Sequence, residues 1–248
     1  MEKIIIQTNP AGKRLYQACQ DGFAVYAAQL DQVQQWSGTL KFLEERDNAI
    51  FEKLGYQNMK GLMTTSSLLT IAASDLSIIV SALYLTKQRL EQIYYMKSAY
   101  LIVYETYMAF QGKQQLLKKE VNEADEELQA KHKLIIKSWR KFIADFKLDS
   151  DVKNVRHKTG GHINTDFSEW YAIVLSLDPQ HTANMLIAFT QIIQDLQFLL
   201  NPLIQRRLNS ILTAGNQAKE RSMNMVEKME QMVPQLDFSA LKDIINKL

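Results

Sequence analysis

Apolar residues recur at intervals of three and four along most of the chain, and no stretch of apolar–polar alternation is long enough to make a sheet. Spacing of three and four places apolar side chains on one face of an α-helix, whereas alternation is typical of a strand. Only nine glycines and four prolines interrupt the pattern in 248 residues. The sequence therefore predicts an all-α multi-helix bundle with about eight or nine helices and no sheet.

The expected helices are separated by short polar or proline-containing segments. Asp178-Pro179 places a capping side chain before a residue whose fixed φ suits the first helical turn. Asn201-Pro202 and Val233-Pro234 are expected to break helices and restart them. The predicted ranges are 13–35, 39–54, 59–86, 88–119, 122–147, 165–176, 179–200, 203–232 and 238–247.

The last predicted helix carries an apolar stripe that needs a partner. Phe238, Leu241, Ile245 and Leu248 are spaced along one face of it. That stripe is expected to dock on the body of the same chain or on a second subunit.

The predicted helix 59–86 carries small hydroxyl residues along one seam and an acid among apolar residues. The seam allows a neighbouring helix to approach closely. Asp75 has apolar residues three and four positions away on either side, as does Glu105 in the next helix, so we expect both acids to be partly buried. A partner at a helix crossing, such as an Arg, a Tyr or a backbone group, would satisfy either one. The seam consists of Ser67, Thr70, Ser74, Ser77 and Ser81.

Segment 68–85 is almost as long as the roughly 20 residues that a membrane span needs. Asp75 and three serines lower its tendency to insert, so a buried helix is expected here and no membrane span. The three isoleucines near the N-terminus are too few for a signal peptide. Cys19 is the only cysteine, which fits a reducing compartment. These features favour a cytoplasmic protein.

Known catalytic motifs are missing from the sequence. It has no G-x-G-x-x-G, G-x-x-x-x-G-K-[ST], H-E-x-x-H or G-x-S-x-G pattern. A di-iron bundle would need two Glu-x-x-His motifs, and none occurs. We therefore expect no metal site and no cofactor.

Positive charge concentrates between residues 131 and 158, where nine Lys and Arg face three Asp, although the formal net charge of the chain is only +2. Within this region Ile135, Trp139, Phe142 and Phe146 are expected to form the buried face of a helix. The opposite, basic face would attract a polyanion, or would simply be a solvated helix face. The candidate nucleic-acid-binding residues are Lys133, Lys137, Arg140, Lys141, Lys153 and Lys158.

Downstream of this helix lies "RHKTGGH", in which Arg156 is followed by His157 and, after further residues, by His162. This arrangement resembles the signature of the HEPN superfamily: an Arg, a polar residue that is usually Asn, Asp or His, and a His, set in an all-α domain. Asn164 stands where the family often has an aromatic residue. The Gly160-Gly161 pair decides whether His162 reaches back to Arg156.

The resemblance implies a metal-independent endoribonuclease or an RNA-binding relative without cleavage activity, commonly a homodimer that pairs two motifs. Members serve in toxin–antitoxin pairs, phage defence and RNA processing. In this interpretation His162 is the general base, Arg156 holds the phosphate and His157 is a polar support. The corresponding domain organisation is an N-terminal helical extension (1–60), a HEPN-like core (61–200) and a C-terminal helical extension (201–248).

Two other interpretations remain open. The chain could be a helical scaffold that binds a protein partner, with "VRHKTGGH" as a basic surface turn. It could also be a bundle that binds a small ligand, in which case a pocket would touch Asp75 or Glu105.

Overall fold

The computed structural model describes residues 10–44, 55–159, 167–232 and 237–247, and ten helical elements account for almost all of them. No strand occurs in these ranges, which confirms the prediction of an all-α bundle. The elements are α2 (Pro10–Glu44), α4 (Tyr56–Leu85), α5 (Arg89–Gln111), α6 (Gln114–Asn122), α7 (Glu126–Asp145), the π-helix η1 (Leu148–Val152), α8 (Lys153–Thr159), α9 (Phe167–Leu175), α10 (Pro179–Met232) and α11 (Ser239–Lys247).

The predicted break at Asn201-Pro202 is wrong, because α10 runs through it without interruption. A proline inside a helix costs about 3 kcal/mol, since it removes a hydrogen bond and its ring crowds the preceding turn. Leu199, Leu200 and Leu203 around the proline are completely buried, and each such side chain contributes roughly 1.5–3 kcal/mol. Core burial on both sides of Pro202 therefore outweighs the cost of the proline. α10 also runs through residue 200, where the sequence predicted the end of the core domain.

Two further differences concern the middle of the chain. The predicted helix 88–119 is divided into α5 and α6 at Gly112. Residues 148–159, expected to be a loop, are helical, and the left-handed backbone of Lys147 (φ 47°) separates them from α7. Arg156 and His157 therefore lie on a helix and not in a turn.

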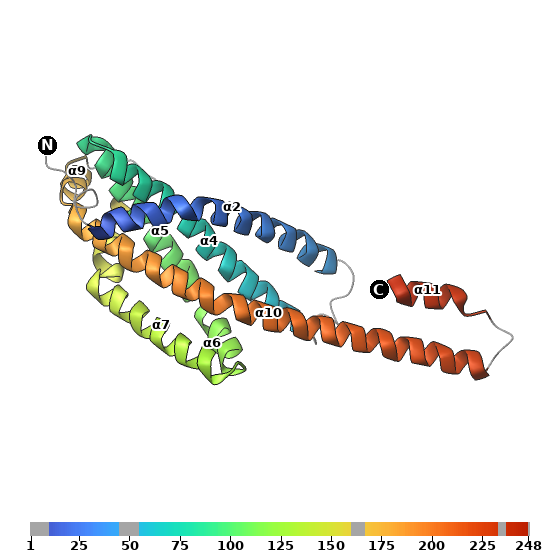
Figure 1. The fold of residues 1–248 in the computed structure, drawn as a ribbon. Helices are drawn as coiled ribbons and strands as arrows, with labels where there is room; N and C mark the ends of the chain where they lie inside the picture. Colours follow the sequence, from blue (N-terminus) through green and yellow to red (C-terminus); the bar gives the residue numbers. More distant parts are fainter. Residues whose placement is uncertain (1–9, 45–54, 160–166, 233–236, 248) are drawn as a thin grey trace.

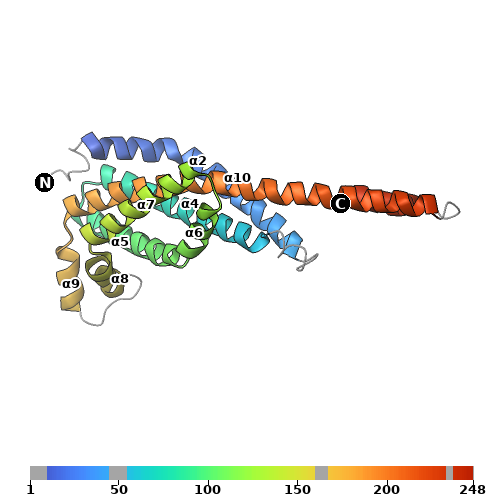
Figure 2. The same cartoon turned by 90° about the horizontal axis from the view of Figure 1, so that it is seen from below.

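The helices α4, α5 and α10 form the centre of the bundle, with α2 packed along α4 and with α6 and α7 on another side (Figures 1 and 2). The 54 residues of α10 span about 80 Å at 1.5 Å per residue. Its C-terminal part projects beyond the body, and α11 folds back along it (Figure 1).

The apolar stripe of the last helix packs against its own chain, as one of the two expected arrangements. Ile245 of α11 and Val226 of α10 are buried, and Lys242 Nζ lies 2.5 Å from Glu230 Oε2. Phe238 is half-buried and Leu241 is exposed, while Leu248 lies outside the described residues.

The hydroxyl seam of α4 faces its neighbours, as its spacing predicts. Thr70, Ser77 and Ser81 are buried. Thr70 and Ser77 donate hydrogen bonds to carbonyl groups one turn earlier in α4, at 3.0 and 2.8 Å, which satisfies hydroxyls that lie away from water. Ser81 accepts a hydrogen bond of 2.7 Å from Gln20 of α2. Small, internally satisfied side chains thus let α2 lie close to α4.

An aromatic cluster joins α5, α7 and α10. The Trp139 ring packs 4.9 Å from Phe110 and 6.1 Å from Phe189, measured between ring centroids, and Phe142 packs 5.2 Å from Phe189. All four side chains are buried. The predicted buried face of α7 is thereby confirmed for Ile135, Trp139 and Phe142, whereas Phe146 is only half-buried.

A buried carboxylate ties α6 to α4 and α10. Glu120 is fully buried and receives a bidentate pair of hydrogen bonds from Arg207 Nη2, at 2.7 and 2.8 Å. Asn58 Nδ2 donates to Glu120 Oε1 at 2.7 Å. Arg206 Nη2 donates to the backbone carbonyl of Glu120 at 2.8 Å. Three helices therefore meet at one satisfied charge.

Arg207 also pairs with Glu123 at 2.9 Å. Burial alone would lower the pKa of Arg207, but hydrogen bonds and charge interactions with Glu120 and Glu123 outweigh it and raise the pKa, so the guanidinium stays charged. At Gly55, where φ is +75°, a Cβ atom would lie 3.0 Å from Arg207 Nη1. Glycine is required there both for its left-handed backbone and for the room it leaves.

Two helices are long and apolar enough to cross a membrane when judged by length and composition: α4 and the part of α10 from Pro179 to Ile211. Within those windows, 50% and 56% of the residues are buried inside the bundle. Core helices of a large bundle meet the same criterion.

We predict that Glu120→Ala destabilises the fold by about 3–5 kcal/mol, because it leaves Arg207 partly buried without its principal partner. Urea denaturation followed by circular dichroism measures the free energy of unfolding. Glu123→Ala is the matched control: the Glu123 side chain is 49% exposed, and we expect a loss of no more than about 1 kcal/mol. Equal losses in the two variants would contradict the assignment.

Candidate nucleic-acid interface

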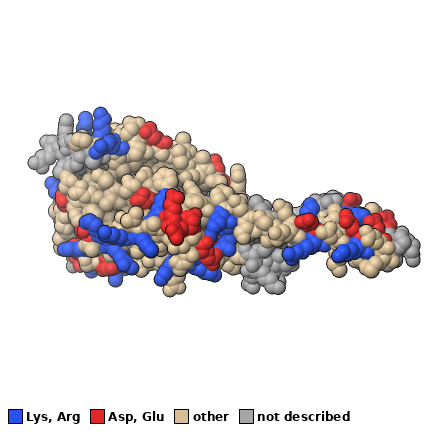
Figure 3. Space-filling model, turned by 60° about the horizontal axis from the view of Figure 1, so that its bottom comes forward, with Lys and Arg blue, Asp and Glu red and all other residues tan. Residues whose placement is uncertain are grey.

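The basic residues of α7 lie opposite its buried face. Lys133, Lys137, Arg140 and Lys141 are all exposed, as the sequence predicts. Residues 133, 137 and 140 follow each other at intervals of four and three, so they form one row along the helix. Figure 3 shows Lys and Arg side chains (blue), interrupted by acidic ones (red), on this aspect of the bundle.

The four basic residues of α7 differ in whether an acidic side chain pairs with them. Lys141 is ion-paired with Asp145 one turn later. Within the part of the chain that the structure describes, no Asp or Glu forms an ion pair with Lys133, Lys137 or Arg140. We call these three residues the α7 basic row. Their charges are therefore open to an external anion.

The helix α8 presents the Arg156 motif next to α5. Val152, Val155 and Thr159 point inward and are buried, which turns the remaining side chains of this short helix outward. The Thr159 hydroxyl donates to the Val155 carbonyl at 2.6 Å. The buried positions thus set the direction in which Arg156 and His157 point.

Arg156 contacts an acid that the sequence singled out for another reason. Arg156 Nε donates to Glu105 Oε1 of α5 at 2.6 Å. The two side chains are 35% and 51% exposed, so the pair contributes at most about 1 kcal/mol to stability. The hydrogen bond engages Nε alone, so it uses neither of the two Nη groups of the guanidinium.

His157 lies beside Arg156 and against an aromatic ring. Its Nδ1 is 3.4 Å from Arg156 Nη1, which can donate in the tautomer whose Nδ1 carries no proton. The imidazole stands edge-on to Tyr104, at 6.1 Å between ring centroids. Arg156, His157, Glu105 and Tyr104 therefore form one contiguous group.

The remaining candidates of the motif region have separate positions. Lys153 is exposed, and Lys158 Nζ is 2.9 Å from Glu169 Oε1 of α9. His162, Gly160 and Gly161 lie outside the described residues.

Neither Asp75 nor Glu105 is an acid of the core, since both side chains are exposed, Glu105 to 51%. For Asp75 the reason is that Ile71 and Ile78 on the same face of α4 are themselves exposed, at 48% and 55%. Loss of part of its hydration still raises the pKa of Asp75. Glu105 instead pairs with Arg156 of α8, which is one of the kinds of partner that the sequence predicted.

Among the described residues the fully buried acid is Glu120, which sequence reasoning did not single out. Its surroundings in the chain, "LLKKEVNE", look like a solvated helix. The one available signal was the Arg206-Arg207 pair within an otherwise apolar stretch, because adjacent arginines in a core helix need acids nearby.

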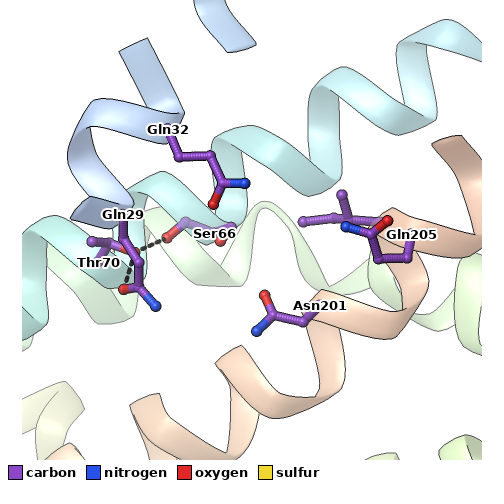
Figure 4. A pocket seen from close by; sticks show the side chains of 7 residues that line it. Gln29, Gln32, Ser66, Thr70, Asn201 and Gln205 are labelled. Atoms are coloured by element: carbon purple, nitrogen blue, oxygen red, sulfur yellow. Dashed lines mark hydrogen bonds between the residues drawn. The ribbon is translucent and has the colours of Figure 1, made fainter. Parts of the chain in front are cut away.

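A pocket of about 230 Å³ lies between α2, α4 and α10 and is lined by uncharged polar side chains (Figure 4). Thr70 at its base accepts a hydrogen bond from Gln197 at 3.2 Å, and Gln29 Oε1 lies 3.4 Å from the Thr70 hydroxyl. Asn201 and Gln205 of α10 line the opposite wall (Figure 4).

Neither Asp75 nor Glu105 lines this pocket, the hollow along α2 or the groove between α5 and α9. In the described residues, no three His, Cys, Asp or Glu side chains are grouped so that they could hold a metal ion.

Comparisons with protein-family models, with curated proteins and with solved structures returned no match. The functional assignment therefore depends on the residues and their geometry.

Tyr107 next to this group provides a pH-dependent test. Its buried ring and its hydrogen bond of 2.8 Å to Asp149 raise its pKa to about 12, with removal of water as the largest cause. Because the pKa of Tyr107 is higher in the folded than in the unfolded protein, the neutral phenol stabilises the fold. This stabilisation is fully present below pH 10 and is lost as the pH rises toward 12. We predict that Asp149→Asn lowers the pKa only part of the way to 10, because the burial remains.

The measurement is absorbance near 295 nm during a pH titration, with Tyr107→Phe to identify the signal. Asp145→Asn, which removes an exposed acid at the end of α7, serves as the control and should leave the Tyr107 pKa unchanged. An Asp149→Asn protein with an unaltered titration would show that Asp149 does not face Tyr107 in solution.

Proposed function

We propose that this protein binds RNA through the α7 basic row and the α8 motif, and that Arg156, His157 and His162 form a HEPN-like, metal-independent endoribonuclease site. The observation that carries the proposal is the row of three exposed cations that have no carboxylate partner among the described residues, on the helix that leads through η1 into α8. Such a row attracts a phosphate backbone irrespective of its sequence.

The contacts of Arg156 suit the role of a phosphate clamp. Glu105 engages Nε and so leaves the Nη groups for phosphate oxygens. In the proposed reaction His162 takes the proton from a ribose 2′-hydroxyl, and the resulting oxygen attacks the adjacent phosphorus. The bond from that phosphorus to the 5′-oxygen of the next nucleotide breaks, which leaves a 2′,3′-cyclic phosphate and a 5′-hydroxyl that takes its proton from solvent. Arg156 stabilises the negative charge on the phosphate oxygens during the attack. His157, held against Tyr104, supports Arg156 as a polar neighbour.

The proposal extends to the setting of the protein. A homodimer that pairs two motifs, a cytoplasmic location, and a role in a toxin–antitoxin pair or in phage defence all belong to it. They come from the resemblance of Arg156, His157 and His162 to the HEPN signature.

We predict that replacing Lys133, Lys137 and Arg140 together by Ala weakens binding of single-stranded RNA at least tenfold. Each phosphate contact contributes about 0.7 to the slope of log K against log salt for a single strand, so the slope should fall by about 2. Fluorescence anisotropy at several salt concentrations measures both quantities. The control replaces Lys13, Lys87 and Lys228, which are exposed on α2, next to α4 and on α10.

Because both triple variants lose the same charge, the comparison separates a local interface from overall attraction. Equal weakening by the two variants, or an unchanged slope for the α7 variant, would reject α7 as the RNA interface.

Cleavage is tested separately, with labelled RNA in the presence of EDTA. We expect the wild-type protein to cleave, and we expect His162→Ala and Arg156→Ala to be at least 100-fold slower, which is the lower range for a lost general base. Glu105→Gln should be only moderately slower, because it keeps a hydrogen-bond acceptor for Arg156. If the wild type binds RNA but neither it nor any variant cleaves, the protein is an RNA-binding relative without nuclease activity. Equal cleavage by the wild type and all variants would reveal a contaminating nuclease.

A second candidate function, a helical interaction protein, is favoured by the projecting hairpin of α10 and α11. Met225, Met229 and Met232 on α10 are exposed, as is Leu241 on α11. Methionine side chains adapt to varied partners, and such exposure is typical of binding surfaces. The projecting part of α10 with α11 lies at the opposite end of the molecule from α8, which carries Arg156, so the two functions do not compete for one surface (Figure 2).

A further inference from the structure

A groove of about 250 Å³ lies between the first turns of α5 and the helix α9, at the end of the bundle. Its α5 wall includes Leu90 and Tyr94, which are 80% and 59% exposed. Its α9 wall includes Tyr171 and Leu175, which are 48% and 41% exposed. A contiguous patch of large exposed apolar side chains is uncommon on a protein surface and marks a binding site more often than chance.

The spacing of these residues explains why a groove forms. Positions 90, 93, 94 and 97 of α5 recur one turn apart, as do positions 170, 171, 174 and 175 of α9. Each helix therefore turns one face toward the other. Val174 is buried at the floor, whereas the outer side chains diverge and leave the groove open.

The charged residues of the groove have one sign. Arg89 and Lys97, two turns apart on α5, are its charged lining residues, and no acid lines it. Neither cation forms an ion pair with an Asp or Glu of the described residues. Lys97 Nζ lies 5.9 Å from the centre of the Tyr94 ring, so a cation is held directly over the apolar wall.

We propose that this groove binds a small organic anion with an apolar body, such as a medium-chain alkyl carboxylate or an aryl carboxylate. The apolar body lies against Leu90, Tyr94 and Val174, and the anionic group is held between Arg89 and Lys97. An apolar pocket with a few convergent polar groups is the usual form of a small-molecule site. Because Arg89 and Lys97 are both positive, the ligand is expected to be negatively charged.

The size of the groove limits the ligand. At roughly 30 Å³ for each water-sized portion, its volume accommodates about eight non-hydrogen atoms, and a longer tail extends through the open mouth. This excludes a folded partner domain as the occupant of the groove itself. The inference is also independent of the proposed RNA site, because it uses no residue of α7 or α8.

The experiment uses isothermal titration calorimetry of the full chain with three probes that share an eight-carbon chain: octanoate, octanol and octyltrimethylammonium. We expect octanoate to bind at one site per chain, and we expect the other two probes to bind at least tenfold more weakly. A double variant, Arg89→Gln with Lys97→Gln, should lose at least tenfold in affinity for octanoate and little for octanol. Leu90→Asp should weaken octanoate binding as well.

The control is Leu134→Asp on α7, which places the same change at a residue of similar exposure (67%) away from the groove and should bind octanoate normally. No octanoate binding, equal affinity for the cationic probe, or an unaffected double variant would each overturn the proposal. If a variant did not fold, the selectivity of the wild-type chain among the three probes would still decide. RNA binding by the wild type is measured in parallel, so failure of one proposal is distinguishable from failure of the other.

Discussion

The buried ion pair between Glu120 and Arg207 fixes the relative positions of three helices. A fully desolvated carboxylate is tolerable only when its oxygens are saturated, and here an arginine and an asparagine from two other helices saturate them. The start of α4, the end of α6 and the middle of α10 must therefore stay in register. Since α7 follows α6 after a short turn, the direction in which α7 presents its basic row depends on the same contact.

The helical class and the faces of the amphipathic helices could be predicted from the sequence, because both follow from local periodicity. The buried side of α7 and the hydroxyl seam of α4 are examples. The continuity of α10 through Pro202 could not, because it is decided by the tertiary burial of leucines around the proline. Residues 148–159 were missed for a similar reason: the helix there is short and is held by its buried Val152 and Val155.

For the candidate site, too, the sequence predicted local features but not long-range contacts. Arg156 and His157 were identified from the sequence, and they do lie side by side. The pairing of Arg156 with Glu105 joins positions 51 residues apart, and no local pattern predicts such a contact. Asp75 and Glu105 lie at the surface of the bundle, because apolar neighbours in the chain do not guarantee a fully buried face. Glu120, which is buried, has lysines beside it in the chain.

The long α10 has a consequence for the hydrodynamic behaviour of the molecule. A compact domain of 248 residues has a radius of gyration of about 18 Å. The axis of α10 alone is about 80 Å long, and its far part has α11 as its described neighbour. A molecule of 28.6 kDa with this shape sediments more slowly than a sphere of equal mass and rotates faster about its long axis than across it.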